Sequence, residues 1–271
     1  MSLRKAFDGE RRKHQEDIWG EESSPSGEEK SWQSPAYAKS SQVLCNQDAL
    51  MKNKCVCITP GATEIDNYKV LRAQIIQRTK ERGWNTLMVT SVQPGEGKTL
   101  TAINLAITLA REFNQTVLLV DCDLKKQDIH KRFGYKSDRG LGDFLLNDCS
   151  LNEIISWPGV EKMTLISGGQ TFQDTTELLG SPQMKSLVAE MKERYANRYI
   201  IFDLPSLKEG ADAITFAPLV DGILVVTQYG RNSAKEINNI LKLIPREKIL
   251  GLIFNRQKRW CHHIVDLKVQ P

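Results

Sequence analysis

The sequence predicts a three-layer α/β domain, in which helices cover both faces of a mostly parallel sheet. Six short runs rich in Val, Ile and Leu are apolar on both faces, which is typical of buried parallel strands. Helix-like stretches separate these runs, as they do where crossover helices join the strands of a parallel sheet. The chain is 271 residues long and 40% hydrophobic, which is enough for one sizeable core.

Strands and helices alternate along residues 63–260, which we assign to this domain. The expected strands are residues 86–90, 116–120, 163–167, 199–202, 222–227 and 249–254. The intervening helices include residues 102–112, 184–195 and 233–243. In a sheet of this kind, ligands bind at the carboxyl ends of the strands.

The two ends of the chain differ from the domain in composition. Residues 8–62 alternate in charge and hold few large apolar side chains. Burial therefore cannot offset the entropy lost when they become ordered. We expect residues 1–62 to form a mostly disordered N-terminal arm and residues 261–271 to form a short C-terminal tail.

Composition also argues against several classes of protein. The net charge of +4 is too small for this length to indicate a nucleic-acid-binding surface. The six cysteines are scattered, and the close pair Cys55 and Cys57 lacks the second pair of a zinc site. No apolar run is long enough to cross a bilayer. We therefore expect a cytoplasmic protein that reaches the inner face of a membrane only through a partner.

The most informative motif follows the first expected strand. It reads Ser-Val-Gln-Pro-Gly-Glu-Gly-Lys-Thr over residues 91–99 and leads into a helix. Its glycines let the backbone curl so that several N–H groups point at one phosphate, as in a Walker A phosphate loop, or P-loop. Lys98 can reach the β- and γ-phosphates, and the Thr99 hydroxyl can bind Mg²⁺. The alternative is a glycine turn between a strand and a helix. The expected phosphate-binding residues are Pro94, Gly95, Glu96, Gly97, Lys98, Thr99 and Leu100.

Two further strands lead into acidic residues. One is followed by Asp121-Cys122-Asp123 and the other by Asp203. Beside a phosphate loop, such carboxylates can hold Mg²⁺ or accept a proton from an attacking hydroxyl. For the first pair, the alternative is a turn that caps the next helix. Following the P-loop in this order, the acids indicate a P-loop NTPase domain that uses ATP and Mg²⁺.

From about Glu64 to Gln257 the chain resembles the bacterial tyrosine kinases of capsular and exopolysaccharide synthesis, the BY-kinase family. The P-loop matches the family pattern throughout, Asp121-Cys122-Asp123 matches its second nucleotide motif, and Asp203-Leu204-Pro205-Ser206 is similar to its Asp-Thr-Pro-Pro. The resemblance implies tyrosine autophosphorylation that regulates polysaccharide synthesis or export. It implies a membrane-embedded polysaccharide co-polymerase or activator protein as the partner. The implied roles are catalysis by Lys98, Asp121 and Asp123, Mg²⁺ binding by Thr99, Asp123 and Asp203, and nucleotide contacts near the adenine by Asn255 and Arg256.

Two departures from the family pattern concern its tyrosines and its assembly. Residues 258–271 contain no tyrosine, where the family commonly carries a tyrosine cluster. The family's Glu-x-x-Arg-x-x-Arg helix, which drives ring assembly, corresponds to Asp66, Lys69 and Arg72 here. Lysine in place of arginine loses a bidentate hydrogen-bonding fork. We therefore expect either a weaker homo-oligomer through this helix or a solvated helix face.

Three functions remain open. The first is a tyrosine autokinase whose acceptor, phosphorylated in trans, we expect to be Tyr37 in the arm. The second is a kinase-like ATPase that acts as a nucleotide switch on the polysaccharide machinery without tyrosine transfer, which the tyrosine-free tail favours. The third is a partition or positioning ATPase. That group carries a lysine early in its P-loop where this chain has Gln93, which argues against it.

Overall fold

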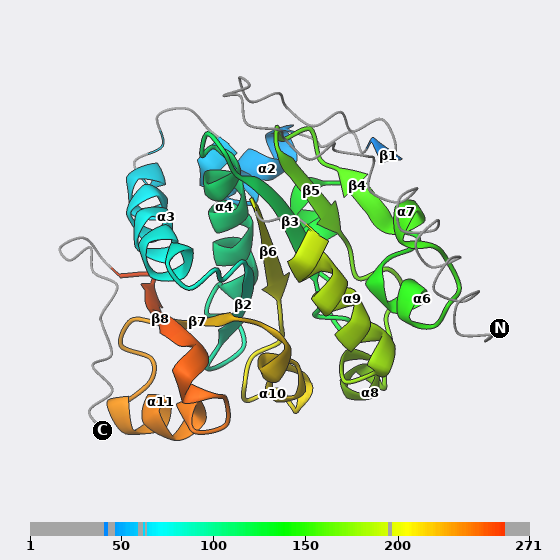
Figure 1. Ribbon diagram of the computed structural model, residues 1–271. Coiled ribbons are helices and arrows are strands. Elements are labelled where there is room, and N and C mark those ends of the chain that lie inside the picture. The colour runs from blue at the N-terminus through cyan, green and yellow to red at the C-terminus, as the bar shows by residue number, and fades with distance from the viewer. Residues whose placement is uncertain (1–40, 43–46, 59–61, 63, 195–196, 258–271) are drawn as a thin grey trace.

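The computed structural model describes residues 41–42, 47–58, 62, 64–194 and 197–257. Within these ranges, eight strands form one sheet in the order β1-β4-β5-β3-β6-β2-β7-β8, which can be followed in Figure 1. Neighbouring strands run parallel except β4 and β5, which are antiparallel. The strands are β1 (Ser41–Gln42), β2 (Thr86–Ser91), β3 (Thr116–Asp121), β4 (Ile155–Trp157), β5 (Met163–Ile166), β6 (Arg198–Asp203), β7 (Gly222–Gln228) and β8 (Ile249–Asn255).

The predicted three-layer α/β fold is confirmed. Each of the six expected strands is present, and its observed ends lie within one residue of the expected ends. The three expected helices correspond to α4 (Lys98–Ala110), α9 (Pro182–Arg194) and α11 (Ala234–Leu241). The other α-helices of the domain are α3 (Ile65–Lys80), α5 (Ile129–Phe133), α6 (Leu141–Leu145), α7 (Leu151–Ile154), α8 (Thr175–Leu179) and α10 (Asp212–Phe216), with 3-10 turns η2 (Ala217–Leu219) and η3 (Arg246–Lys248).

Helices cover both faces of the sheet because its central strands are apolar on both sides. In β2, Leu87 and Val89 pack with α3 and α4, whereas Met88 packs with α9, α10 and α11 on the opposite face. Side chains along a strand alternate between its two faces, so one continuous apolar run supplies two cores. All six residues of β2 are buried. This packing fixes the positions of β2 and α4, and therefore the position of the loop that joins them.

Parallel strands bring their carboxyl ends to one edge of the sheet. β6 lies between β2 and β3, and Asp203 at the end of β6 is in register with Asp121 at the end of β3. The loop that leads from β2 into α4 begins at the same edge. The motifs that are far apart in the sequence are therefore neighbours in the fold.

Part of the segment expected to be a disordered arm is ordered. Residues 47–58 form α2 (Gln47–Lys52) and η1 (Val56–Ile58), and Leu50, Cys55 and Cys57 are buried in the core beside α4. The Asn104 side chain on α4 accepts a hydrogen bond from the Cys57 N–H at 3.0 Å. Few apolar residues suffice here because α4 offers a surface already shaped to receive them. The predictions for residues 1–40, which include Tyr37, and for the tail 261–271 lie outside the described residues.

A buried carboxylate ties the start of β7 to β2. Asp221 accepts hydrogen bonds from the backbone N–H groups of Asn85 at 3.1 Å and Thr86 at 3.2 Å, and from the Thr86 hydroxyl at 2.8 Å. It also pairs with the Lys192 ammonium group. Burial by itself raises the pKa of Asp221, but the hydrogen bonds from Lys192 and Thr86 outweigh it and lower the pKa below its ordinary value.

Asp221→Asn is expected to reduce the free energy of unfolding at neutral pH by about 2 kcal/mol, since a charge-assisted network is lost. Because the folded-state pKa is lowered, this stabilisation is present above the unfolded-state pKa and disappears as the pH falls through the folded-state value. Urea denaturation of both proteins between pH 7 and pH 3 measures it. Asp138→Asn, which changes an exposed carboxylate, is the control. A stability difference that stays constant over this pH range would contradict the prediction.

Candidate functional site

The loop between β2 and α4 has the backbone geometry of a phosphate cradle. Gly95 and Gly97 adopt φ values of 79° and 97°, in the left-handed region that favours glycine. A Cβ atom on Gly97 would lie 2.1 Å from the Asn255 side-chain nitrogen, so no larger residue fits there. Lys98 and Thr99 form the first turn of α4, whose N-terminus carries a partial positive charge. Together, the curled loop and the helix end suit an anionic phosphate group.

Glu96 contributes its backbone to this loop, while its side chain turns away. The carboxylate is fully buried and accepts hydrogen bonds from the N–H groups of Gln93 at 2.7 Å and Gln228 at 3.1 Å. Pro94 and Leu100 likewise offer backbone, since the Pro94 carbonyl accepts a bond from Arg231 and the Leu100 side chain packs against the core. The anionic group of the motif thus points away from the phosphate cradle.

The two residues expected near the adenine lie at the end of β8, beside the P-loop. Asn255 donates a hydrogen bond from Nδ2 to the Glu96 carbonyl at 2.8 Å. Arg256 is exposed and donates to the Gln228 side chain at 3.0 Å. Asn255 therefore supports the loop backbone directly.

Lys98, Asp123 and Asp203 meet at the carboxyl edge of the sheet. The Lys98 ammonium group lies 2.8 Å from Asp123 Oδ2 and 3.7 Å from Asp203 Oδ1. Burial lowers the pKa of Lys98, but the charges of Asp203 and Asp123 outweigh burial and raise it overall. Lys98 is thus held in its charged form at the position from which it can reach a phosphate.

Asp121, at the end of β3, neighbours Asp203 of this cluster and is fully buried. Its carboxylate accepts hydrogen bonds from the N–H groups of Asp123 and Ile129, each at 3.1 Å. Burial raises the pKa of Asp121, and the neighbouring Asp203 raises it further. The contact with Ile129, the first residue of α5, is the capping contact of the alternative interpretation. The structure therefore gives Asp121 both a cap and an environment that favours proton uptake.

The residues around Asp203 fit a magnesium ion. Both carboxylate oxygens of Asp203 are buried and lack a hydrogen-bond partner of normal geometry. Burial raises the pKa of Asp203, which Lys98 and the Thr99 hydroxyl partly offset. Carboxylate and hydroxyl oxygens are the ligands that Mg²⁺ prefers, and substrate phosphates and water usually complete its shell. Within the described residues no group of three His, Cys, Asp or Glu side chains forms a metal site by itself. The arrangement that fits is one in which protein side chains and substrate phosphates together bind the magnesium ion.

The three charged residues of the expected assembly helix are engaged within their own chain. On α3, Lys69 pairs with Asp66 at 2.8 Å, and both are largely exposed. Arg72 pairs with Glu112 at 2.7 Å and donates to the Thr108 carbonyl at 3.1 Å. Arg72 thus anchors α3 to the end of α4, whereas Asp66 and Lys69 stay exposed.

Sequence reasoning missed several residues of the site, namely Thr227, Arg231 and Asn232. These residues lie at the end of β7 and in the turn that follows it, and each contacts the P-loop. Their own segment carries no recognisable motif. One signal could have located them. The strand expected at residues 222–227 ends at residue 227, and in a parallel sheet this end lies at the same edge as the P-loop.

Comparison with known proteins agrees with this geometry. The family model described as the CobQ/CobB/MinD/ParA nucleotide binding domain matches residues 87–264, which include the P-loop and all three acids. The chain belongs to this family. The match covers the domain from β2 to beyond β8. The family description, nucleotide binding, thus agrees with what the fold and the P-loop motif indicate.

The relatives within this family confirm the resemblance to bacterial tyrosine kinases. The tyrosine-protein kinase YwqD of Bacillus subtilis is 29% identical over 220 residues, covering 80% of this chain and 92% of YwqD. The succinoglycan biosynthesis transport protein ExoP of Rhizobium meliloti is 31% identical over 209 residues, covering 75% of this chain but 26% of ExoP. The kinase domain of the Escherichia coli tyrosine kinase ETK shares the fold, with a TM-score of 0.69 and 24% identity over 82% of this chain and 92% of that domain.

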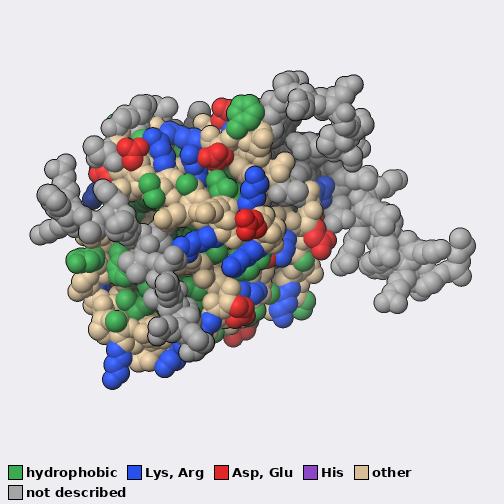
Figure 2. All heavy atoms as spheres, turned by 60° about the vertical axis from the view of Figure 1, so that its left-hand side comes forward, with side chains coloured by type: hydrophobic (Ala, Val, Ile, Leu, Met, Phe, Trp, Pro, Cys, Tyr) green, Lys and Arg blue, Asp and Glu red, His purple; other side chains and the backbone are tan. Residues whose placement is uncertain are grey.

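The surface of this family member is mixed in character. On the face that Figure 2 presents, Lys and Arg side chains are interspersed with acidic and hydrophobic ones. Among the described residues, no helix has the length and apolar character needed to cross a membrane.

Proposed function

We propose that this protein is an ATP- and Mg²⁺-dependent tyrosine autokinase that regulates capsular or exopolysaccharide synthesis or export. The observation that carries the proposal is the cluster of Lys98, Asp123 and Asp203 beside a complete P-loop. In it, the buried Asp203 carboxylate lies 3.7 Å from the Lys98 ammonium group but has no hydrogen-bond partner of normal geometry. The names of the relatives support tyrosine as the acceptor and polysaccharide synthesis as the setting.

The chemistry follows from the positions of these side chains. The P-loop N–H groups and Lys98 bind the phosphates and orient the γ-phosphoryl group toward the incoming tyrosine hydroxyl. Thr99, Asp123 and Asp203 would hold Mg²⁺, which when bound neutralises charge on the phosphates. The bond between the γ-phosphorus and the bridging β-phosphate oxygen of ATP breaks, and ADP leaves. The phosphoryl group is transferred to the tyrosine oxygen, and Asp121 takes up the hydroxyl proton. Its raised pKa suits that proton transfer.

Incubation of the full chain with Mg-ATP, followed by phosphotyrosine mapping by mass spectrometry, tests the function. The described tyrosines include poor acceptors, since Tyr199 is buried and burial raises the pKa of Tyr68 to about 12. We expect phosphorylation in trans on Tyr37, so Tyr37→Phe should remove most of the signal. Tyr229→Phe, which changes a tyrosine that is 58% exposed, is the control. An unchanged signal in Tyr37→Phe would show that another acceptor is used.

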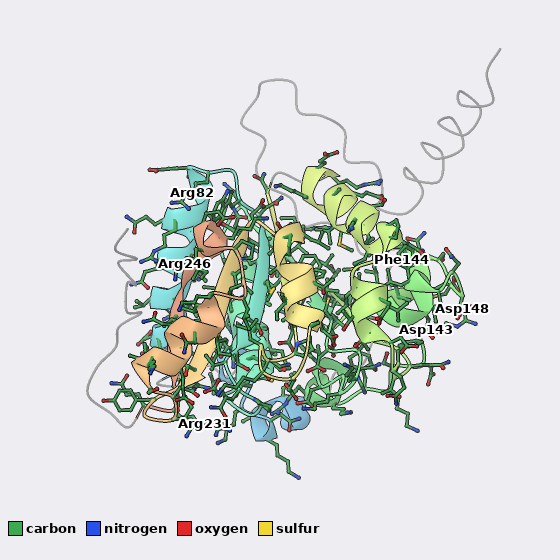
Figure 3. The ribbon with its side chains drawn as sticks, turned by 90° about the horizontal axis from the view of Figure 1, so that it is seen from below. Arg82, Asp143, Phe144, Asp148, Arg231 and Arg246 are labelled. Atoms are coloured by element: carbon green, nitrogen blue, oxygen red, sulfur yellow. The ribbon has the colours of Figure 1, made fainter. Side chains whose placement is uncertain are left out.

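Asp121→Asn separates catalysis from capping. As a proton acceptor, Asp121 should matter more for kcat than for ATP affinity, and we expect kcat to fall about 100-fold. Asp143→Asn is a matched control, because Asp143 accepts a hydrogen bond from Gly140 N–H at 2.8 Å and likewise caps a helix. Figure 3 shows Asp143 with Phe144 and Asp148 on the side of the molecule away from Arg231. If Asp121→Asn lowers only the melting temperature, as expected for Asp143→Asn, Asp121 is a cap alone.

The second candidate function is a nucleotide switch that hydrolyses ATP without transferring phosphate to tyrosine. The buried position of Tyr199 and the half-buried position of Tyr68 favour it, since neither hydroxyl can easily reach an active site. Steady ATP hydrolysis without phosphotyrosine, with and without an activator, would select this function. A partition ATPase is disfavoured, because the Gln93 side chain donates to Asn232 of its own chain and carries no charge toward a second chain.

The proposed partner is a membrane-embedded polysaccharide co-polymerase or activator, which would place the protein at the cytoplasmic face of a membrane. We also propose a homo-oligomer in which the exposed Asp66 and Lys69 contact a second chain. Light scattering on the same kinase samples tests this assembly. A strictly monomeric protein that still accumulates phosphotyrosine would contradict it.

A further inference from the structure

The turn between β7 and α11, residues 229–233, contacts the P-loop at three points. Arg231 donates a hydrogen bond to the Pro94 carbonyl at 2.8 Å. The Gln93 side chain donates to Asn232 Oδ1, and Asn232 Nδ2 donates to Glu96 Oε1. Figure 3 shows Arg231 beside α11, at the start of which this turn ends. One bond to the P-loop backbone and two bonds between side chains therefore join the turn to the P-loop.

Glu96 is the centre of these contacts. Its Oε1 atom also accepts hydrogen bonds from Gln228 N–H at 3.1 Å and from the Thr227 hydroxyl at 3.3 Å. A buried carboxylate needs such donors, because leaving it unpaired in a low-dielectric interior is costly. Its own backbone carbonyl accepts from Asn255 on β8. Both ends of Glu96 are thus held, between the two glycines that give the loop its curl.

We infer that Asn232 is a positioning residue of the nucleotide site, which holds the P-loop in its phosphate-binding conformation through Glu96. The inference rests on nucleotide binding by the P-loop, as proposed above. Asn232 accepts from Gln93 and donates to Glu96 and to the Thr227 hydroxyl, the last at 2.8 Å. A side chain that is donor and acceptor at once is required, which asparagine is and alanine or aspartate is not.

The effect on binding should not depend on the γ-phosphate. The P-loop N–H groups contact phosphates that ADP and ATP share. An ordered loop spares the nucleotide the entropy of ordering it, so a loosened loop should weaken both ligands by the same factor. The acidic cluster at the ends of β3 and β6 makes no contact with Asn232. The kcat at saturating ATP should therefore change much less than the affinity.

Isothermal titration of the 271-residue chain with Mg-ADP and with a non-hydrolysable Mg-ATP analogue tests the inference. For Asn232→Ala we expect both Kd values to rise about tenfold, which corresponds to the loss of one or two hydrogen bonds. For Asn232→Asp we expect a larger rise, because a second carboxylate would face Glu96. Asn238→Ala, which changes an exposed asparagine on α11, the helix that follows the turn, should bind as the parent does.

The outcomes distinguish this inference from the proposed function. Unchanged Kd values in both Asn232 variants overturn the inference, as does a lower melting temperature with unchanged affinity of the folded protein. A rise confined to the ATP analogue also overturns it, since it would place Asn232 at the γ-phosphate. Absence of ADP binding by the parent protein would overturn the proposed function together with the inference. Equal rises for both ligands, with kcat largely retained, support it.

Discussion

Lys98→Met is expected to lower kcat/KM for ATP by about 10³-fold or more. Phosphoryl transfer depends on cations that stabilise charge on the transferring group, and removal of one such group costs a factor of this order. The Lys98 side chain is 11% exposed, and its ammonium group lies 2.8 Å from Asp123 and 3.7 Å from Asp203. Coupled ATPase assays and phosphotyrosine immunoblots on the purified variant measure the loss.

The same substitution removes the cation that compensates two buried carboxylates. We therefore expect the melting temperature of Lys98→Met without nucleotide to fall, and the fall to become smaller at low pH as the carboxylates take up protons. Activity must accordingly be normalised to folded protein. Lys185→Met, an exposed lysine on α9, controls for the loss of one positive charge. Near-normal turnover by folded Lys98→Met would contradict the site assignment.

Asp203→Asn is expected to raise the Mg²⁺ concentration for half-maximal activity at least about tenfold and to lower kcat about 100-fold. Asparagine keeps the shape of the side chain but loses the charge that binds the ion. Burial raises the pKa of Asp203 even though Lys98 lies 3.7 Å away, so the charged form of Asp203 is disfavoured in the folded protein. Removing this charge should therefore leave the melting temperature of the metal-free protein unchanged or higher, unlike a change at a structural carboxylate.

Magnesium titrations of the ATPase rate and calorimetry in chelator test both parts of this prediction. Asp138→Asn, which removes an exposed carboxylate, is the control for net charge. A Mg²⁺ dependence identical to that of the parent would exclude Asp203 as a ligand. A large fall in the metal-free melting temperature would show that Asp203 is held by contacts that stabilise the fold.

The alternation of strands and helices could be predicted because each of the long strands is a recognisable apolar run in the sequence. A parallel strand covered on both faces must be apolar throughout, so β2, β3, β5, β6, β7 and β8 are visible as short apolar runs. β4 (Ile155–Trp157) and β1 (Ser41–Gln42) escaped prediction because two or three residues cannot show a period. β4 is a strand because β5 presents an edge to pair with, and β1 in turn pairs with β4.

The order of residues 47–58 could not be predicted for a related reason. Its apolar residues are few, and composition alone predicts that they cannot offset the entropy of ordering. In the structure Leu50, Cys55 and Cys57 are fully buried because they pack against α3, α4 and α5, whose surfaces are formed by other parts of the chain. These tertiary contacts stabilise the segment, and no pattern in its own sequence predicts them.

By itself the sequence determined the α/β class, the P-loop and the acids that accompany it, because local order and residue type carry that information. The tertiary structure alone decided that Glu96 turns away from the phosphate cradle, that Asn255 supports the loop backbone, and that Asn232 reaches Glu96. These contacts join residues 136 and 159 positions apart. Their partners are chosen by the order of strands in the sheet, which brings the ends of β7 and β8 beside the P-loop. A motif specifies the chemistry that a loop can perform, whereas the packing of distant strands sets the geometry in which it does so.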